Sequence, residues 1–148
     1  MSADAQAAIV VCPHCGQKNR LSAAASGHPR CGNCHELLPW LVAADDQSFE
    51  HELQTSLPVL VDLWAPWCGP CKWVTPAIEE VATTHKGQLK VIKVNVDEAP
   101  QVATRFEVRG IPTLVVMRDG QEVDRIAGAP SKPDLVAWLE HHLAERVG

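Results

Sequence analysis

The sequence predicts an α/β fold, with a mixed central sheet flanked by helices and a small cysteine-rich module in front of it. Three observations indicate this fold. Runs of β-branched residues alternate with helical patterns from about Gln47 onward, and two strands near the C-terminal end follow each other as a hairpin. The six cysteines form Cys-x-x-Cys pairs, and the first two pairs lie in a segment without regular pattern. We therefore divide the chain into an N-terminal module over residues 1–39, a linker over 40–46 and a main domain over 47–148.

One strand and two helices are expected in the first half of the main domain. Ser48 is placed to cap a short helix that runs through Leu53. Residues 58–64 form a continuous apolar run, as expected for a strand buried on both faces. The helix after the third cysteine pair ends near Gly87. Its apolar residues recur at helical spacing: Val74, Ile78, Val81 and Ala82.

The second half predicts one more buried strand, a hairpin and two helices. Residues 89–96 are rich in β-branched side chains and read as a strand, and a short helix follows over 99–106. Strands over 113–117 and 122–126 surround a turn that contains Asp-Gly. The last helix begins near Ser131. Its apolar stripe consists of Leu135, Trp138, Leu139 and Leu143.

Composition narrows the class of protein. The chain has 148 residues, of which 46% are hydrophobic, so it can build a core of ordinary size. Its net charge of −5 offers no basic surface for nucleic acid and argues against binding at a membrane surface. No apolar segment is long enough to span a bilayer, and the N-terminal residues do not resemble a signal peptide. We therefore expect a cytoplasmic protein, in which cysteines act as metal ligands or catalytic thiols.

The third cysteine pair has the sequence Cys68-Gly69-Pro70-Cys71 and lies between the buried strand and the following helix. Free N–H groups and the helix dipole at a helix N-terminus stabilise an anion, so the pKa of a thiol there is lowered. The thiolate is the nucleophile of disulfide exchange. The alternatives are a structural disulfide or half of a metal site, but two thiols alone are a poor zinc site. The strand–turn–helix context favours redox chemistry.

A family resemblance appears around this pair. Residues 64–72, Trp-Ala-Pro-Trp-Cys-Gly-Pro-Cys-Lys, resemble the active-site motif of thioredoxins almost residue for residue. The similarity extends to Pro76, to the Gly-Ile-Pro-Thr sequence of residues 110–113 and to Gly128. It implies a thioredoxin fold and a protein-disulfide reductase. The chain departs from the common pattern at Leu63, where an aromatic residue is frequent, and at Trp73, a position that bears on partner choice.

The resemblance also assigns roles to individual residues. It makes Cys68 the attacking thiol and Cys71 the resolving thiol. It implies a cis peptide bond before Pro112, which then lies against the disulfide. The implied substrate surface consists of Trp67, Gly69, Pro70, Ile111, Pro112 and Gly128. Recycling by a thioredoxin reductase is implied as well. The chain carries no glycine-rich dinucleotide fingerprint, so flavin and nicotinamide are expected on that partner and not here.

Asp62 is the one charge in the apolar run before Trp64. It is either an edge carboxylate in water or a buried acid whose pKa is raised by desolvation. In the second case it accepts the proton of Cys71 when that thiol attacks the mixed disulfide. Lys93 matches the family's buried lysine near this aspartate, although its side chain is long enough to reach the surface. We expect Lys93 to support the acid.

The first two cysteine pairs predict a metal site. Cys12-x2-Cys15-x15-Cys31-x2-Cys34 has the spacing of a zinc ion bound by four cysteines in a ribbon-like module. The Pro-His dipeptide after Cys12 also occurs in strongly oxidising proteins of this fold, so a second redox centre is the alternative. Three histidines are either surface residues or substitute ligands: His14, His28 and His35.

The complete arrangement resembles the zinc-containing, two-domain thioredoxins of the thioredoxin-2 type. This resemblance implies one structural zinc ion, disulfide-containing protein substrates and a monomer. Residues 1–45 carry as many acidic as basic side chains, so nucleic-acid binding by the module is not expected. Two rival functions remain open. One is a sensor or holdase in which oxidation of the zinc thiols releases the metal, and the other is a binding scaffold with incidental thiols.

Overall fold

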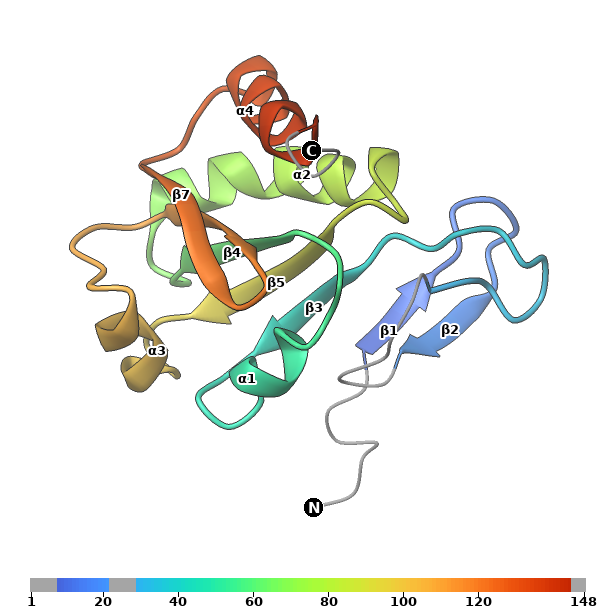
Figure 1. Cartoon of the computed structure of the whole chain (residues 1–148), viewed down its shortest axis with the longest axis horizontal. Coiled ribbons are helices and arrows are strands. Elements are labelled where there is room, and N and C mark those ends of the chain that lie inside the picture. The colour runs from blue at the N-terminus through green and yellow to red at the C-terminus, as the bar shows by residue number, and fades with distance from the viewer. Residues whose placement is uncertain (1–7, 22–28, 145–148) are drawn as a thin grey trace.

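The structure is a computed structural model that describes residues 8–21 and 29–144. Within these residues the strands form a two-stranded sheet, β1-β2, and a five-stranded sheet with the order β3-β5-β4-β6-β7 (Figure 1). In chain order the elements are β1 (Ala8–Val11), β2 (Lys18–Leu21), β3 (Leu41–Ala44), α1 (Phe49–Glu52), β4 (Val59–Trp64), α2 (Gly69–Thr84), β5 (Lys90–Asn95), α3 (Pro100–Arg105), β6 (Thr113–Arg118), β7 (Gln121–Ala127) and α4 (Lys132–Ala144).

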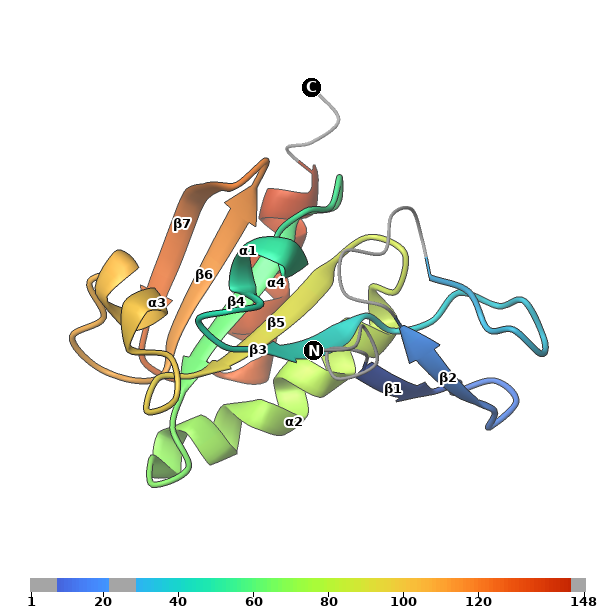
Figure 2. The ribbon, with the colours of Figure 1, turned by 90° about the horizontal axis from the view of Figure 1, so that it is seen from below.

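The larger sheet is mixed, as predicted. Strands β3, β5 and β4 are parallel, whereas β6 runs antiparallel to β4 and β7 antiparallel to β6. Helices α2 and α4 cover one face, and α1 and α3 cover the other (Figures 1 and 2). The α/β fold class is therefore confirmed. Within the described residues, none of the helices has the length and apolar character that a membrane crossing requires.

Both faces of the sheet are covered by apolar side chains, including those that recur at helical spacing in α2 and α4. On one face, Ile78 and Val81 of α2 meet Leu135 and Leu139 of α4, and all four are at most 1% exposed. On the other face, the ring of Phe49 packs edge-on against the ring of Phe106, with centroids 5.7 Å apart. Such close packing holds the strand ends in place, and the disulfide described below lies just after the end of β4.

The predicted linker over residues 40–46 is wrong, because this segment contains β3. β3 is an edge strand of the main sheet and pairs in parallel with β5, for example Leu41 with Val91. Trp40 and Val42 are buried. Four residues are too few to show a strand period, and the strand's only pairing partner lies about fifty positions further along the chain. The main domain consequently begins before residue 47.

The cap of the first short helix also differs from the prediction. Ser48 occupies the N-cap position, but its hydroxyl caps no helix N–H and instead donates to Asp45 Oδ1 at 3.2 Å. Asp45 Oδ1 in turn accepts the N–H groups of Gln47 and Ser48, at 2.9 and 3.0 Å. The aspartate therefore organises the turn into α1, because its side chain reaches the backbone two and three residues ahead.

A buried ion pair lies beneath α1. Lys90 and Glu52 are 0% and 1% exposed, and their charged groups are 2.8 Å apart. Lys90 Nζ also donates to the Glu52 carbonyl and lies 4.3 Å from the centroid of the Trp40 ring. Burial lowers the pKa of Lys90, and the hydrogen bond and charge of Glu52 oppose that shift. The pair fixes α1 against the start of β5, and removing one partner would leave an uncompensated buried charge.

The cysteine-rich module packs against the sheet. Cys12, Cys31 and Leu38 belong to the same hydrophobic cluster as Trp40. The side chain of Leu37 fills the space beside Gly87, just after α2. In both views the module lies beyond the C-terminal end of α2, and the N-terminal end of that helix points away from it (Figures 1 and 2).

Candidate functional site

The third cysteine pair forms a disulfide at the N-terminus of α2. Cys68 and Cys71 are bonded to each other, with their Cα atoms 5.3 Å apart. Cys68 is the N-cap residue with extended backbone angles, and its Sγ accepts the N–H of Cys71 at 3.2 Å. This N–H would otherwise lack a partner in the first turn. The same N–H and the helix dipole are available to a Cys68 thiolate when the disulfide opens, which lowers the cost of forming the anion.

The loop before β6 lies directly against this disulfide. The Ile111–Pro112 peptide bond is cis, as the family resemblance implies. Cys68 Sγ is 3.7 Å from the carbonyl oxygen of Ile111. The N–H of Gly128, just after β7, donates to the Pro112 carbonyl at 2.8 Å. Segments far apart in the sequence therefore meet at the disulfide, and three of the predicted substrate-surface residues lie there.

The other predicted surface residues are exposed around the disulfide. Gly69 and Pro70 form the exposed first turn of α2. Trp67 is 70% exposed, and its Nε1 donates to Asp97 Oδ2 at 2.9 Å. The disulfide itself is covered, since Cys68 is only 4% exposed. Sequence reasoning missed Asp97, which lies after β5 and shows no local signal that would pair it with a tryptophan thirty residues earlier.

Asp62 lies inside the sheet and not in water. Asp62 is only 1% exposed. Its Oδ1 has no hydrogen-bond partner within the described part of the chain. Burial raises the pKa of Asp62 to about 6, and the charge of Lys93 opposes this rise. Asp62 and Lys93 are register partners in β4 and β5. An acid with this pKa can take up and release a proton near neutral pH.

Lys93 is half-buried. This is intermediate between a fully buried lysine and one whose side chain extends to the surface, the two positions that the sequence allows. Its Nζ lies 5.2 Å from the centroid of the Trp64 ring. It therefore reaches along the sheet next to Asp62 and ends over an aromatic face. A cation in this position favours the ionised form of Asp62, which limits how far burial raises the pKa.

The first two cysteine pairs come together in one cluster. The sulfur atoms of Cys12, Cys15, Cys31 and Cys34 all lie within 4.8 Å of one another. The Cys12–Cys34 and Cys15–Cys31 sulfur pairs are both 3.6 Å apart. Four sulfurs about 2.3 Å from a tetrahedral zinc ion would be about 3.8 Å apart. The distances and the donor type both fit such a cation, so this cluster can hold a metal ion.

The two halves of the cluster repeat one turn. The carbonyl of Cys12 accepts the N–H of Gly16 at 2.9 Å, and the carbonyl of Cys31 accepts the N–H of His35 at 2.9 Å. Gly16 and His35 both have a positive φ, of 81° and 66°. His35 therefore serves the turn in the structure, and the cluster includes neither His35 nor His14. His28 lies outside the described residues.

Polar groups around the cluster favour the thiolate of Cys31. Asn33 donates its backbone N–H to Cys31 Sγ at 3.4 Å, and Asn19 donates its amide at 3.5 Å. The backbone N–H of Cys34 is the largest cause that lowers the pKa of Cys31, to about 6. The backbone N–H of Glu36 lowers the pKa of Cys34, but burial and the neighbouring sulfurs together outweigh it and raise the pKa to about 12. Four crowded thiols thus need a cation before all of them ionise. Sequence reasoning missed both asparagines.

The chain resembles known thioredoxins over most of its length. The thioredoxin family model matches residues 40–141. Thioredoxin 1 of Synechococcus elongatus is 50% identical over 102 residues, which are 68% of this chain and 95% of that protein. Thioredoxin C-3 of Corynebacterium nephridii is 40% identical over 144 residues, which are 95% of this chain and 99% of that protein. The second alignment therefore covers the cysteine module as well as the main domain.

Proposed function

This chain belongs to the thioredoxin family and is a thiol–disulfide oxidoreductase, and we propose that it reduces disulfides of other proteins through Cys68 and Cys71. The observation that carries this proposal is the position of the pair. Cys68 caps α2 with its sulfur on a helix N–H, and the Ile111–Pro112 segment lies alongside. An exchange centre needs such a stabilised thiolate and a backbone against which a substrate can align.

In the proposed reaction the reduced pair passes two electrons to a substrate disulfide. The Cys68 thiolate attacks one substrate sulfur, the substrate S–S bond breaks, and the departing thiolate takes up a proton. Cys71 then loses its proton and attacks Cys68 Sγ, which breaks the mixed disulfide and releases the second substrate thiol. The products are two substrate thiols and the Cys68–Cys71 disulfide. A thioredoxin reductase that carries flavin and uses NADPH returns two electrons and two protons to this disulfide.

Asp62 is the proposed proton acceptor in the second step. Its burial and its raised pKa, about 6, support this role, because the carboxylate is available at neutral pH and its protonated form is also accessible. Lys93 is a positioning residue that keeps part of the Asp62 population ionised. The remaining predicted residues form the surface on which a substrate strand pairs: Trp67, Gly69, Pro70, Ile111, Pro112 and Gly128.

We also propose that the four-cysteine cluster binds one structural zinc ion. Cys12, Cys15, Cys31 and Cys34 would hold it, and the ion would stabilise the module by neutralising their thiolates. The acidic composition supports protein partners in place of nucleic acid or membrane. We place the protein in the cytoplasm as a monomer, since zinc-binding cysteines that form no disulfide suit a reducing compartment.

The test is NADPH-coupled reduction of insulin disulfides in the presence of thioredoxin reductase. Wild-type protein should turn over, and Cys68→Ser should not. Folded, zinc-loaded wild type that fails with this reductase but works with dithiothreitol would overturn only the recycling partner. Failure with both donors would overturn the reductase proposal and favour the sensor or scaffold functions.

A further inference from the structure

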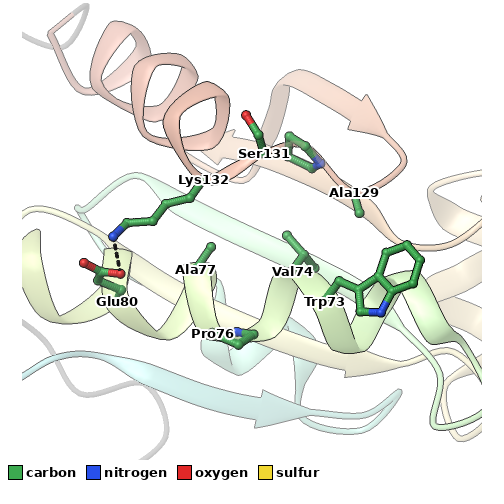
Figure 3. A pocket seen from close by; sticks show the side chains of 9 residues that line it. Trp73, Val74, Pro76, Ala77, Glu80, Ala129, Ser131 and Lys132 are labelled. Atoms are coloured by element: carbon green, nitrogen blue, oxygen red, sulfur yellow. Dashed lines mark ion pairs between the residues drawn. The ribbon is translucent and has the colours of Figure 1, made fainter.

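A groove of about 540 Å³ lies between α2 and the segment that joins β7 to α4 (Figure 3). Val74 and Ala77 of α2 line it on one side, and Ala129 and Ser131 line it on the other. The ring of Trp73 stands at one end. The proposed reaction uses none of these residues.

Trp73 is the most unusual part of this groove. The side chain is 77% exposed, the highest exposure among the large hydrophobic residues of the described chain. It is therefore not needed for the core, which Val74 fills from the next position with 2% exposure. A large indole kept in water costs solubility, and exposed aromatic rings beside a concave apolar surface are enriched where other proteins bind.

Both walls of the groove begin within a few residues of the redox centre. Trp73 follows Cys71 by two residues, and Ala129 follows Gly128, whose N–H binds the Pro112 carbonyl. At 1.5 Å per helical residue, the groove spans about 7 to 14 Å along α2 from the position of Cys68. An extended polypeptide covers about 3.3 Å per residue. A substrate aligned at the disulfide therefore reaches the groove two to four residues from its reacting cysteine.

The charges at the far end of the groove leave it without net charge. Lys132 and Glu80 face each other there, 2.6 Å apart (Figure 3). The ammonium group of Lys132 and the carboxylate of Glu80 pair with each other, so neither charge needs a charged ligand as its partner. A charged substrate side chain would lose hydration against the apolar walls and gain no partner, whereas an apolar side chain would gain contact area.

We propose that this groove is a substrate subsite that receives an apolar side chain, aromatic or branched aliphatic, two to four residues from the attacked cysteine. The proposal rests on the disulfide-reductase function proposed above. It makes Trp73 a specificity-determining residue that distinguishes substrates by the sequence around their disulfide, in addition to the accessibility of the disulfide itself.

The experiment uses pre-reduced full-length protein and symmetric peptide disulfides, so that no reductase is needed. Each peptide carries one cysteine and a single phenylalanine or serine two, three or four residues away on either side. Second-order rates of reduction are measured by chromatography of quenched samples. At one or more positions phenylalanine should raise the rate about tenfold over serine. In Trp73→Ala this ratio should fall to about one, and Trp73→Phe should restore it.

Ile9→Ala is the matched control, because Ile9 is an exposed hydrophobic residue of the cysteine module, 58% exposed and distant from the groove. It should keep the wild-type ratio. Ala129→Glu tests the groove from its opposite side. It should lower the phenylalanine-to-serine rate ratio by placing a carboxylate in the groove. Equal rates for phenylalanine and serine at every position, or an unchanged ratio in Trp73→Ala, would overturn the subsite. Failure of wild type to reduce even dithiobis(nitrobenzoate) would overturn the reductase function itself, and the subsite with it.

Discussion

The cysteine cluster and the redox disulfide use the same Cys-x-x-Cys spacing in different surroundings. Cys68 and Cys71 bond to each other across the start of a sixteen-residue helix. In the cluster, Cys12 and Cys15 lie in a tight turn, and their sulfurs approach those of the other pair. At the helix N-terminus the two sulfurs of one pair lie close enough to form a disulfide with each other. In the module the turn directs the two sulfurs of each pair toward the sulfurs of the other pair. The element that carries the spacing thus decides the chemistry.

The two centres are also far apart. The disulfide is at the N-terminal end of α2, and the cluster lies beyond its C-terminal end (Figures 1 and 2). Sixteen helical residues span about 24 Å. Sulfur-to-sulfur exchange needs direct contact, so the two sets of thiols of one chain cannot exchange electrons directly. Mutations at the two centres should therefore have separable effects on turnover and on zinc binding.

The largest expected effect is on the rate of disulfide reduction. Cys68→Ser removes the attacking thiolate and should lower turnover by at least about 10³-fold, the range seen when a nucleophile is lost. Turnover of Cys31→Ser, normalised to the folded fraction, should stay near that of wild type. The insulin assay measures both. If Cys31→Ser proved as inactive as Cys68→Ser, the two centres would act as one catalytic unit.

The next effect is on stability and metal content. Cys31 is 1% exposed and shares a hydrophobic cluster with the main domain, so its loss should disturb the sheet as well as the module. We expect Cys31→Ser to lose bound zinc and about 2 to 5 kcal/mol of unfolding free energy. Metal analysis and urea unfolding measure the two quantities.

His35→Asn is the control for this variant. Asparagine tolerates the positive φ of His35, so the turn should persist and zinc should remain bound. Loss of one equivalent of zinc from His35→Asn would contradict the four-cysteine ligand set and support histidine as a ligand.

The sequence predicts which cysteines come together in each centre, because each grouping depends on local chemistry. The two pairs over residues 12–34 have metal-ligand spacing, and Cys68–Cys71 follows a buried strand and opens a helix. The pairing of Asp62 with Lys93 was also accessible, through family resemblance. In each case a short motif, or its position within one element, carries the information.

Features that depend on distant partners were missed. The sequence predicts a linker where β3 lies, because Leu41–Ala44 becomes a strand only through pairing with β5. The sequence drew attention to Lys93, yet the fully buried lysine is Lys90, whose partner Glu52 lies 38 residues earlier. Both lysines sit in the same apolar run, and no local pattern distinguishes them. Burial of a charge is decided by whether an opposite charge arrives from elsewhere in the fold.

A third effect concerns Asp62 and depends on pH. Its folded pKa, about 6, is above the ordinary value of 3.8, so the folded state disfavours the ionised form. This cost is absent below pH 3.8, grows as pH rises, and is complete above pH 6. Asp62→Asn should therefore stabilise the protein by up to about 3 kcal/mol at pH 8 and by little at pH 4. Urea unfolding at both values measures the difference.

The same variant should slow the release of substrate from the mixed disulfide. Loss of a proton acceptor costs about 10²-fold in the step that it serves. Attack by Cys68 should be affected less, so the mixed disulfide should accumulate and be visible by mass spectrometry. A stability gain that does not depend on pH, or equal slowing of both steps, would count against Asp62 as the acceptor.

The smallest expected effect lies at the junction between the two regions. Gly87 has a φ of +82°, and a Cβ built there would lie 2.8 Å from Leu37 Cδ1 of the cysteine module. Gly87→Ala should cost about 1 to 2 kcal/mol, part from the backbone and part from the contact. Adding Leu37→Ala should recover the contact part, which a double-mutant cycle in urea unfolding measures. If Leu37→Ala gave no recovery, the whole cost would belong to the backbone of Gly87. Recovery would show that the module and the sheet press on each other across this contact. The two cysteine centres would then be separate in chemistry but joined in stability.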